Sequence, residues 1–195
     1  MPIDVSTFLA GLTESRGAHQ VTERKGFVPA SGLVLPVALE VALRHRLLLT
    51  PVLARSRLAT TSASIGVPSC EREQIEYWLA RYGENANWLV ETGEAGVVSL
   101  EIDLRLARHT LAHLASGDHA WQRSLHFAAY GKWHVLFEHV AGLPSLRDYP
   151  GLSLHSGDSI LVPPSRTPSG IGFVYANPHA PLLSADWLGK AALLR

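Results

Sequence analysis

The chain has a single cysteine, no net charge and no long apolar run. Cys70 alone excludes an intramolecular disulfide and a zinc site built from several cysteines. Seventeen basic and seventeen acidic residues cancel, so nucleic-acid binding would depend on a local basic patch. No apolar run approaches the roughly 18 residues of a membrane span, and the first residues do not resemble a signal peptide. We therefore expect a soluble, cytoplasmic protein with no membrane partner.

The chain also lacks the short patterns of several common enzyme classes. It has no phosphate-binding P-loop pattern, and the glycines of GEAG and SGIG are typical of turns. His109 and His113 are four residues apart on a predicted helix. Their HTLAH sequence has no glutamate after the first histidine, so it does not indicate a zinc hydrolase. Any catalytic chemistry must therefore come from another set of residues.

What the chain does have is the length and the apolar content of one domain. Its 195 residues are 47% apolar and 17% charged, which argues against disorder of the whole chain. Residues 1–34 are polar with scattered apolar positions, and we interpret them as an N-terminal extension that could be flexible. Residues 35–195 form the predicted domain. Helical and strand-like segments are mixed along it with hairpin-type links, which favours an α+β fold.

The predicted elements follow from periodicity and from proline and glycine positions. Helices are expected at residues 37–49, 70–82, 104–116 and 184–194, with Thr50 and Pro51 ending the first and Ser69 capping the second. Strands are expected at 87–93 and 96–103, on both sides of a Tyr130–Gly131 turn, within 151–165, and near 170–177. The segment 151–165 reads either as a strand pair or as one strand with a bulge near Gly157.

Two carboxylates, Glu101 and Asp103, close the strand at 96–103. Residues two apart on a strand point to the same face, so these side chains would project together. Paired carboxylates repel unless a cation lies between them, and Mg²⁺ and Mn²⁺ prefer such oxygen ligands. Two-metal phosphoryl transfer uses this arrangement. The alternative is a solvated strand edge that runs into a helix N-terminus, and the spacing alone leaves both interpretations open.

Further motifs follow the Trp-containing segment 70–82 in a fixed order: Thr92–Gly93, Glu101 and Asp103, Gly131 with His134 and Phe137, Gly151, Pro163–Pro164–Ser165 and Tyr175. This succession resembles the N-terminal domain of bifunctional DNA primase/polymerases, the prim-pol branch of archaeo-eukaryotic primases. The resemblance covers roughly residues 37–192. It implies a prim-pol-like mixed, mostly antiparallel sheet flanked by helices.

The resemblance also implies a function, namely template-directed nucleotide addition in DNA replication with two divalent ions, Mg²⁺ or Mn²⁺. At the matching positions, Glu101 and Asp103 would be catalytic metal ligands, and His134 would be a catalytic contact to the phosphates of the nucleotide. Implied partners are a nucleoside triphosphate, a DNA template bound through a weak or local basic patch, and a separate helicase or replication protein.

Three other residues are candidate nucleotide contacts. Ser165 follows two prolines and could bind a phosphate, although a rigid strand-ending turn explains it equally well. The family's Gly-Lys-x-Pro loop is absent, and ARSRLATT stands in its place. Arg55 and Arg57 are the only basic candidates there.

The chain departs from the family pattern at the third acidic ligand, where Ser153 stands, and at an arginine two residues on, where His155 stands. Asp158 is close, but on a regular strand it would face away from the Ser153 side. Two functions therefore stay open: an active nucleotidyltransferase, or a catalytically inactive prim-pol-like domain that binds nucleotide or nucleic acid as a replication accessory module. An unrelated α+β protein is a third alternative. In that case Glu101, Asp103 and His134 would not converge on one cleft.

Overall fold

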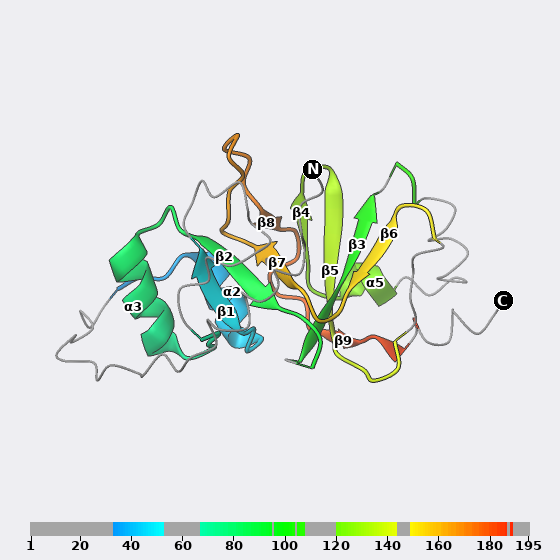
Figure 1. The fold of residues 1–195 in the computed structure, drawn as a ribbon, viewed down its shortest axis with the longest axis horizontal. Coiled ribbons are helices and arrows are strands. Elements are labelled where there is room, and N and C mark those ends of the chain that lie inside the picture. The colour runs from blue at the N-terminus through cyan, green and yellow to red at the C-terminus, as the bar shows by residue number, and fades with distance from the viewer. Residues whose placement is uncertain are drawn as a thin grey trace, which may run out of the picture.

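The computed structural model describes residues 33–52, 67–94, 96–103, 105–107, 120–143, 149–186 and 188. In this part of the chain, nine strands form two sheets that lie side by side, with helices at their edges (Figure 1). Every strand pair is antiparallel except that between β5 and β9. The α+β prediction with a mixed, mostly antiparallel sheet is therefore confirmed.

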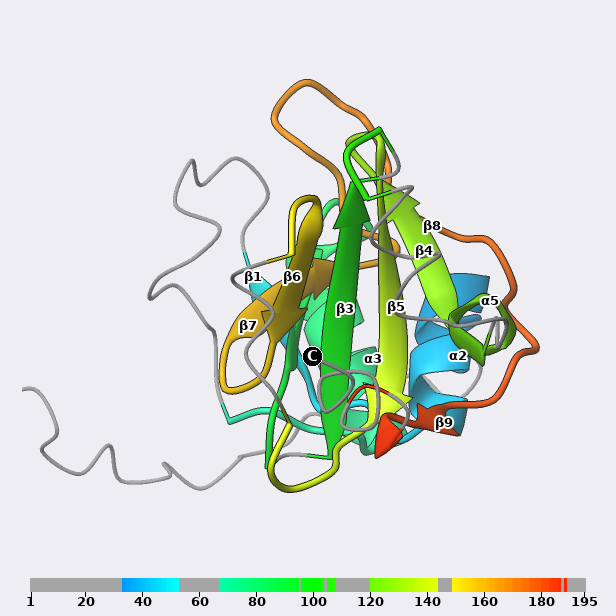
Figure 2. The ribbon, with the colours of Figure 1, turned by 90° about the vertical axis from the view of Figure 1, so that its right-hand side faces the viewer.

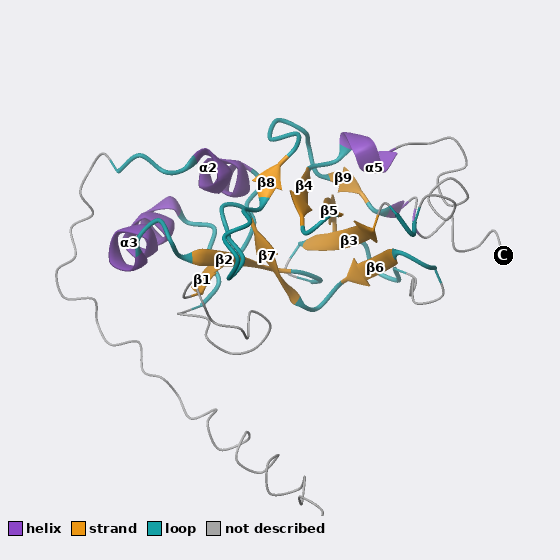
Figure 3. Ribbon diagram, turned by 90° about the horizontal axis from the view of Figure 1, so that it is seen from above, coloured by secondary structure: helices purple, strands orange, loops and turns teal. Residues whose placement is uncertain are grey.

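The smaller sheet has the strand order β1-β2-β7, and the larger has the order β6-β3-β5-β4-β8 with β9 paired to β5. Their bounds are β1 Leu49–Val52, β2 Asn87–Glu91, β3 Val97–Asp103, β4 His126–Ala129, β5 Lys132–Glu138, β6 Leu152–His155, β7 Ser159–Val162, β8 Val174–Tyr175 and β9 Leu183–Ser184. The helices are α2 Val37–Arg44, α3 Arg72–Tyr82 and α5 Ala120–Arg123. Seen from above, α2 and α3 lie at the end of the molecule where β1 and β2 are (Figure 3).

Helix α3 buries one face against the smaller sheet. Ile75, Trp78 and Leu79 are buried at helical spacing, and the ring of Trp78 lies 6.4 Å from that of Trp88 on β2. Gly83 ends the helix with φ +76°, a conformation that glycine adopts at low cost. These contacts form an apolar core that continues to Phe127 and the larger sheet.

Strand β3 separates a second core from a polar surface. Val98, Leu100 and Ile102 are fully buried on one face, where they pack with residues of β5 and with Leu188. The alternate residues of β3, among them Glu101 and Asp103, lie on the opposite face, as a period of two requires. The larger sheet therefore presents a polar face at the middle of the molecule.

The first helix and first strand differ from the prediction. Helix α2 ends at Arg44 and not at Leu49, and Arg46 adopts a positive φ of 53°. Leu49–Val52 then pairs with β2 as β1, in which Pro51 is tolerated because β1 ends the strand order of its sheet. The apolar run LLL at residues 47–49 therefore divides between an irregular segment and a strand, which helical periodicity alone did not predict.

The segment 151–165 also resolves into more than one element. β6 pairs with β3 in the larger sheet, and β7 pairs with β2 in the smaller sheet. Residues 156–158 connect them as a bend, so the phase argument against Asp158 does not apply. A strand pair was one of the two predicted alternatives, but its members belong to different sheets.

Several predictions fall on other parts of the chain. Outside the described residues lie residues 1–32 of the predicted extension, Arg55 and Arg57, and most of the predicted helices at 104–116 and 184–194. Residues 105–107 form a turn, so the first of those helices does not begin directly after β3. None of the described helices is long and apolar enough to cross a membrane.

Candidate functional site

A pocket of about 620 Å³ lies between the polar face of the larger sheet and β7 of the smaller one. Figure 2 shows β6, β3, β5 and β4 side by side, with β7 beyond β6. The larger sheet contributes one side chain each from β3, β5 and β6, and the remaining wall comes from turns and from β7. The lining residues are Glu101, Tyr130, His134, His155, Gly157, Asp158, Ser159, Ile160, Leu161 and Phe173.

The strand register brings Glu101 and His134 together. Glu101 is directly opposite His134 on β5 and opposite Ser153 on β6. His134 stacks on Phe127 of β4 with ring centroids 4.9 Å apart and planes 6° from parallel. Its Nδ1 lies 3.5 Å from the hydroxyl of Ser99, so one face and one edge of the imidazole are constrained. The two predicted residues therefore converge on one cleft.

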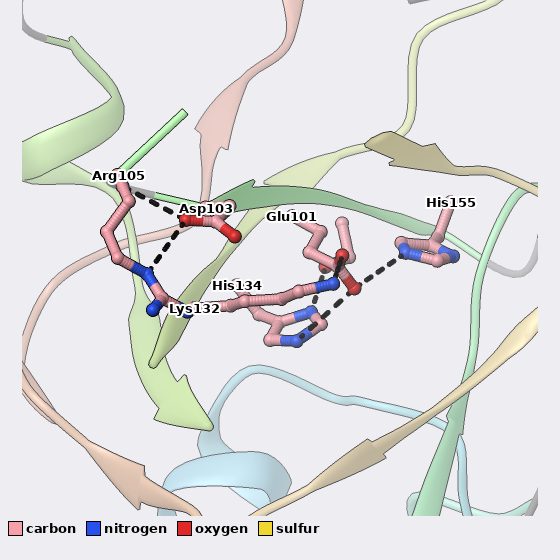
Figure 4. A network of polar contacts seen from close by, with 7 residues as sticks. Glu101, Asp103, Arg105, Lys132, His134 and His155 are labelled. Atoms are coloured by element: carbon pink, nitrogen blue, oxygen red, sulfur yellow. Dashed lines mark hydrogen bonds and ion pairs between the residues drawn. The ribbon is translucent and has the colours of Figure 1, made fainter. Parts of the chain in front are cut away.

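Glu101 contacts three basic side chains (Figure 4). The ammonium group of Lys132 donates a short hydrogen bond to Glu101 Oε1. Nε2 of His155 lies 3.5 Å, and Nε2 of His134 3.8 Å, from Oε2 of the same carboxylate. The contacts of His155 and Lys132 outweigh the effect of partial burial and lower the pKa of Glu101 to about 2. The carboxylate is therefore a stable anion with cationic partners of its own.

The two histidines have opposite electrostatic environments. Burial dominates at His134 and lowers its pKa to about 4, although Glu101 favours the charged form. At His155, the contact with Glu101 raises the pKa, and a contact of 3.4 Å between its Nδ1 and Oδ2 of Asp158 acts in the same direction. The pocket thus combines the neutral imidazole of His134, held by stacking, with the imidazole of His155, which is more easily protonated.

Asp103 is on the same face of β3 as Glu101 but has a different surrounding. Its Oδ1 accepts a hydrogen bond of 3.0 Å from the backbone N–H of Arg105 and lies 3.8 Å from the guanidinium Nε of that residue. Its backbone carbonyl accepts hydrogen bonds from Leu106 and Ala107. Asp103 does not line the pocket, so it holds the turn that follows β3.

Ser165 is buried away from the pocket. Its hydroxyl accepts a hydrogen bond of 2.8 Å from the backbone N–H of Trp88 and donates one of 3.1 Å to the carbonyl of the same residue. The structure thus connects the segment after Pro163–Pro164 to β2 and does not bring Ser165 to Glu101 and His134.

The Thr92–Gly93 pair supports the turn of Gly157 and Asp158, which lines the pocket. The N–H and the hydroxyl of Thr92 both donate to the carbonyl of Asp158 at 2.8 Å. Gly93 approaches the next turn so closely that a Cβ at this position would lie 2.7 Å from the backbone nitrogen of Gly157. This pair therefore positions Asp158 and His155 opposite Glu101.

The comparisons with known proteins agree with this arrangement. Residues 38–186 match the profile of the family described as bifunctional DNA primase/polymerase, N-terminal. The chain belongs to this prim-pol family. No curated protein matches it. Membership implies a primase/polymerase-type domain of DNA replication that binds nucleotide and DNA, and the family generally uses divalent metal ions.

The described side chains of this prim-pol domain do not fit a two-metal centre. In the described ranges, no three His, Cys, Asp or Glu side chains are arranged to hold a metal ion. The position opposite Glu101 on β6 is Ser153, and Asp103 lies outside the pocket. Lys132 already neutralises Glu101. Near a protein surface, two like unit charges about 4 Å apart repel by roughly 4 kcal/mol, and a divalent ion doubles this.

Two residues of the site were not among the candidates from sequence. Lys132 precedes His134 by two positions, and His155 follows Ser153 by two, so each shares a strand face with a residue that was considered. The period-of-two alternation along each strand therefore already indicated that both residues share the face of the candidate site. Only the register of β5 and β6 against β3 shows that both basic side chains reach Glu101.

Proposed function

We propose that this prim-pol domain binds a nucleotide in the pocket between its sheets and serves DNA replication as a catalytically inactive accessory module. The observation that carries the proposal is the ion pair of Lys132 with Glu101, the residue at the position of the family's first metal ligand. A carboxylate held by an ammonium group can organise a binding site, and a metal ion would have to displace that ammonium group to reach it. Ser153 opposite Glu101 agrees with this interpretation.

The pocket has the size and the lining of a nucleotide site. Ligand pockets usually enclose about 300–1,000 Å³, and this one falls inside that range. Tyr130, half exposed in the β4–β5 turn, and Phe173 lie with ring centroids 5.7 Å apart at the apolar side. A base can stack on such rings, while the polar side at Glu101 and His155 faces the sugar and phosphates.

The second candidate is template-directed nucleotide addition itself, with Mg²⁺ or Mn²⁺ at Glu101 and Asp103. The neighbouring positions of Glu101 and His134 favour it, because they match the family arrangement. It requires the ion to replace Lys132 at Glu101. A helicase or replication protein as partner and a cytoplasmic location stay predictions.

Two assays on the full chain separate these functions. A fluorescent deoxynucleoside triphosphate, titrated with the protein with and without Mn²⁺, measures binding. Extension of a primed DNA template in Mn²⁺ measures catalysis. We expect saturable nucleotide binding and no extension. Extension that is lost in Glu101→Gln would support the second candidate, and the absence of nucleotide binding under both conditions would exclude both.

A further inference from the structure

Two basic side chains, Lys132 and His155, contact Glu101 on the polar face of the larger sheet. Lys132 reaches from β5 across to Glu101, although Asp103 is its direct partner in the strand register. Figure 4 shows its side chain running past His134 to the carboxylate of Glu101. Lys132 is not itself a lining residue, so its ammonium group lies beside the pocket, at Glu101. Forty percent of the Lys132 side chain is exposed, so its free N–H groups remain accessible to a ligand.

His155 supplies a second basic group from the opposite strand. One ring nitrogen faces Glu101 at 3.5 Å and the other faces Asp158 at 3.4 Å. The ring is a quarter exposed and lines the pocket, and it lies 6.2 Å from the ring of His134. Lys132 and His155 therefore flank Glu101 from two strands, and the carboxylate fixes both.

Both acids at the family's metal-binding positions have a cation from the chain itself. Lys132 forms an ion pair with Glu101, and Arg105 lies with its Nε 3.8 Å from Oδ1 of Asp103. In a metal-dependent site, these positions hold the ions that neutralise the phosphates. Here positive charge is already present, and Lys132, paired with the pocket residue Glu101, can donate hydrogen bonds to phosphate oxygens.

We propose that the pocket binds the phosphate groups of a nucleotide without a metal ion, with Lys132 as the hydrogen-bond donor, His155 as a neighbouring basic group and Glu101 as the residue that holds both. This inference rests on the proposed function, because it specifies how the nucleotide is bound. Glu101 would then affect binding in the opposite way to a metal ligand, because its negative charge lies close to the phosphates and opposes their binding.

Calorimetric titration of the full chain with a deoxynucleoside triphosphate, in EDTA and separately in Mn²⁺, tests the inference. We expect binding in EDTA that Lys132→Met weakens by about tenfold or more, since it removes a charge-assisted hydrogen bond. Glu101→Gln should retain or strengthen binding in EDTA. The matched control is Arg105→Met, which removes the cation at the other acid and should leave the affinity within about twofold.

The outcomes separate this inference from the proposed function. Binding that needs Mn²⁺ and is lost in Glu101→Gln would overturn the metal-free mode, while nucleotide binding itself would stand. No heat of binding in either buffer would overturn the proposed function as well. Urea unfolding checks each variant. If Lys132→Met does not fold, Lys132→Arg, which keeps the charge, is compared with Glu101→Gln. Equal loss of nucleotide binding in both variants would contradict the roles assigned here.

Discussion

Glu101 is a fixed negative charge in its present surroundings. With its pKa lowered to about 2 by His155 and Lys132, it stays ionised throughout the range in which proteins function. It therefore cannot exchange protons as a general acid or base at neutral pH. Its main effect on the neighbouring residues is electrostatic, because it orients an ammonium group and an imidazole toward the pocket.

His134 provides the clearest pH prediction. Burial lowers its pKa to about 4, so it should titrate far below the ordinary value of 6.5. NMR of the imidazole resonances, assigned by comparison with His134→Gln, should show a midpoint near pH 4. A midpoint near 6.5 would mean that the ring is solvated and not stacked on Phe127.

The same shift has a consequence for stability. The unfolded chain takes up the proton first, so the contribution of neutral His134 is complete above pH 6.5 and is lost as the pH falls toward 4. The full effect is at most about 3 kcal/mol. Urea unfolding of the wild type should therefore show a steeper loss of stability between pH 6.5 and 4 than unfolding of His134→Gln.

Ser165 allows its two interpretations to be separated directly. Ser165→Ala would leave the buried N–H and carbonyl of Trp88 without their partner, at a cost of about 1–3 kcal/mol. Ser153→Ala is the matched control, since Ser153 is exposed on β6. We expect a lower urea midpoint only for Ser165→Ala. Unchanged stability with weaker nucleotide binding would instead make Ser165 a ligand contact.

At the scale of elements, the period-of-two alternation of side chains predicted which face of each central strand carries the polar residues. In β3 and β5 it separates the buried residues from Glu101 and His134, and the Tyr130–Gly131 turn was identified from its glycine. The assignment of β6 and β7 to different sheets could not be predicted, because both have the same alternation. Pairing partners depend on contacts between distant segments, which no local pattern contains.

For the same reason, the sequence indicated part of the candidate site only. The acid-apolar-acid motif identified Glu101, and its spacing placed Asp103 on the same face. The environment that distinguishes them comes from Lys132, 31 residues away, and from Arg105 in the following turn. Whether a carboxylate faces a metal or a lysine depends on register, and register is a tertiary property.

The contact between the β2–β3 and β6–β7 connections gives a test at this scale. Gly93 has φ +97° and its added Cβ would lie 2.7 Å from the nitrogen of Gly157. Gly96, in the same connection, has φ +113° with no atom within 4 Å of such a Cβ. Gly96→Ala should therefore cost about 1–3 kcal/mol through backbone strain alone.

Gly93→Ala should cost more than Gly96→Ala, because it adds a steric clash to similar strain. It should also weaken nucleotide binding, since the displaced turn carries Asp158 and adjoins His155. Urea unfolding and nucleotide titration of both variants measure these effects. Equal losses of stability would show that the two connections are not in tight contact.

At the scale of the whole molecule, the pocket exists because two sheets meet. One apolar core fills the space around the smaller sheet and continues to the larger sheet, and a second core covers the opposite face of the larger sheet. Between the sheets, the polar residues of β3, β5 and β6 face β7 across the pocket. Glu101 is thereby placed inside the molecule's central cleft, with its cations supplied by neighbouring strands.

The pairing of Lys132 with Glu101 is tested most directly by electron paramagnetic resonance of Mn²⁺. The spectrum is recorded during titration with the full chain in the presence of a deoxynucleoside triphosphate. With Lys132 at Glu101, we expect only the Mn²⁺ signal of the nucleotide, with no additional ion held by the protein and no change in Glu101→Gln. An additional stoichiometric ion in the wild type that disappears in Glu101→Gln would show that Glu101 is a metal ligand and that the domain keeps its family's chemistry.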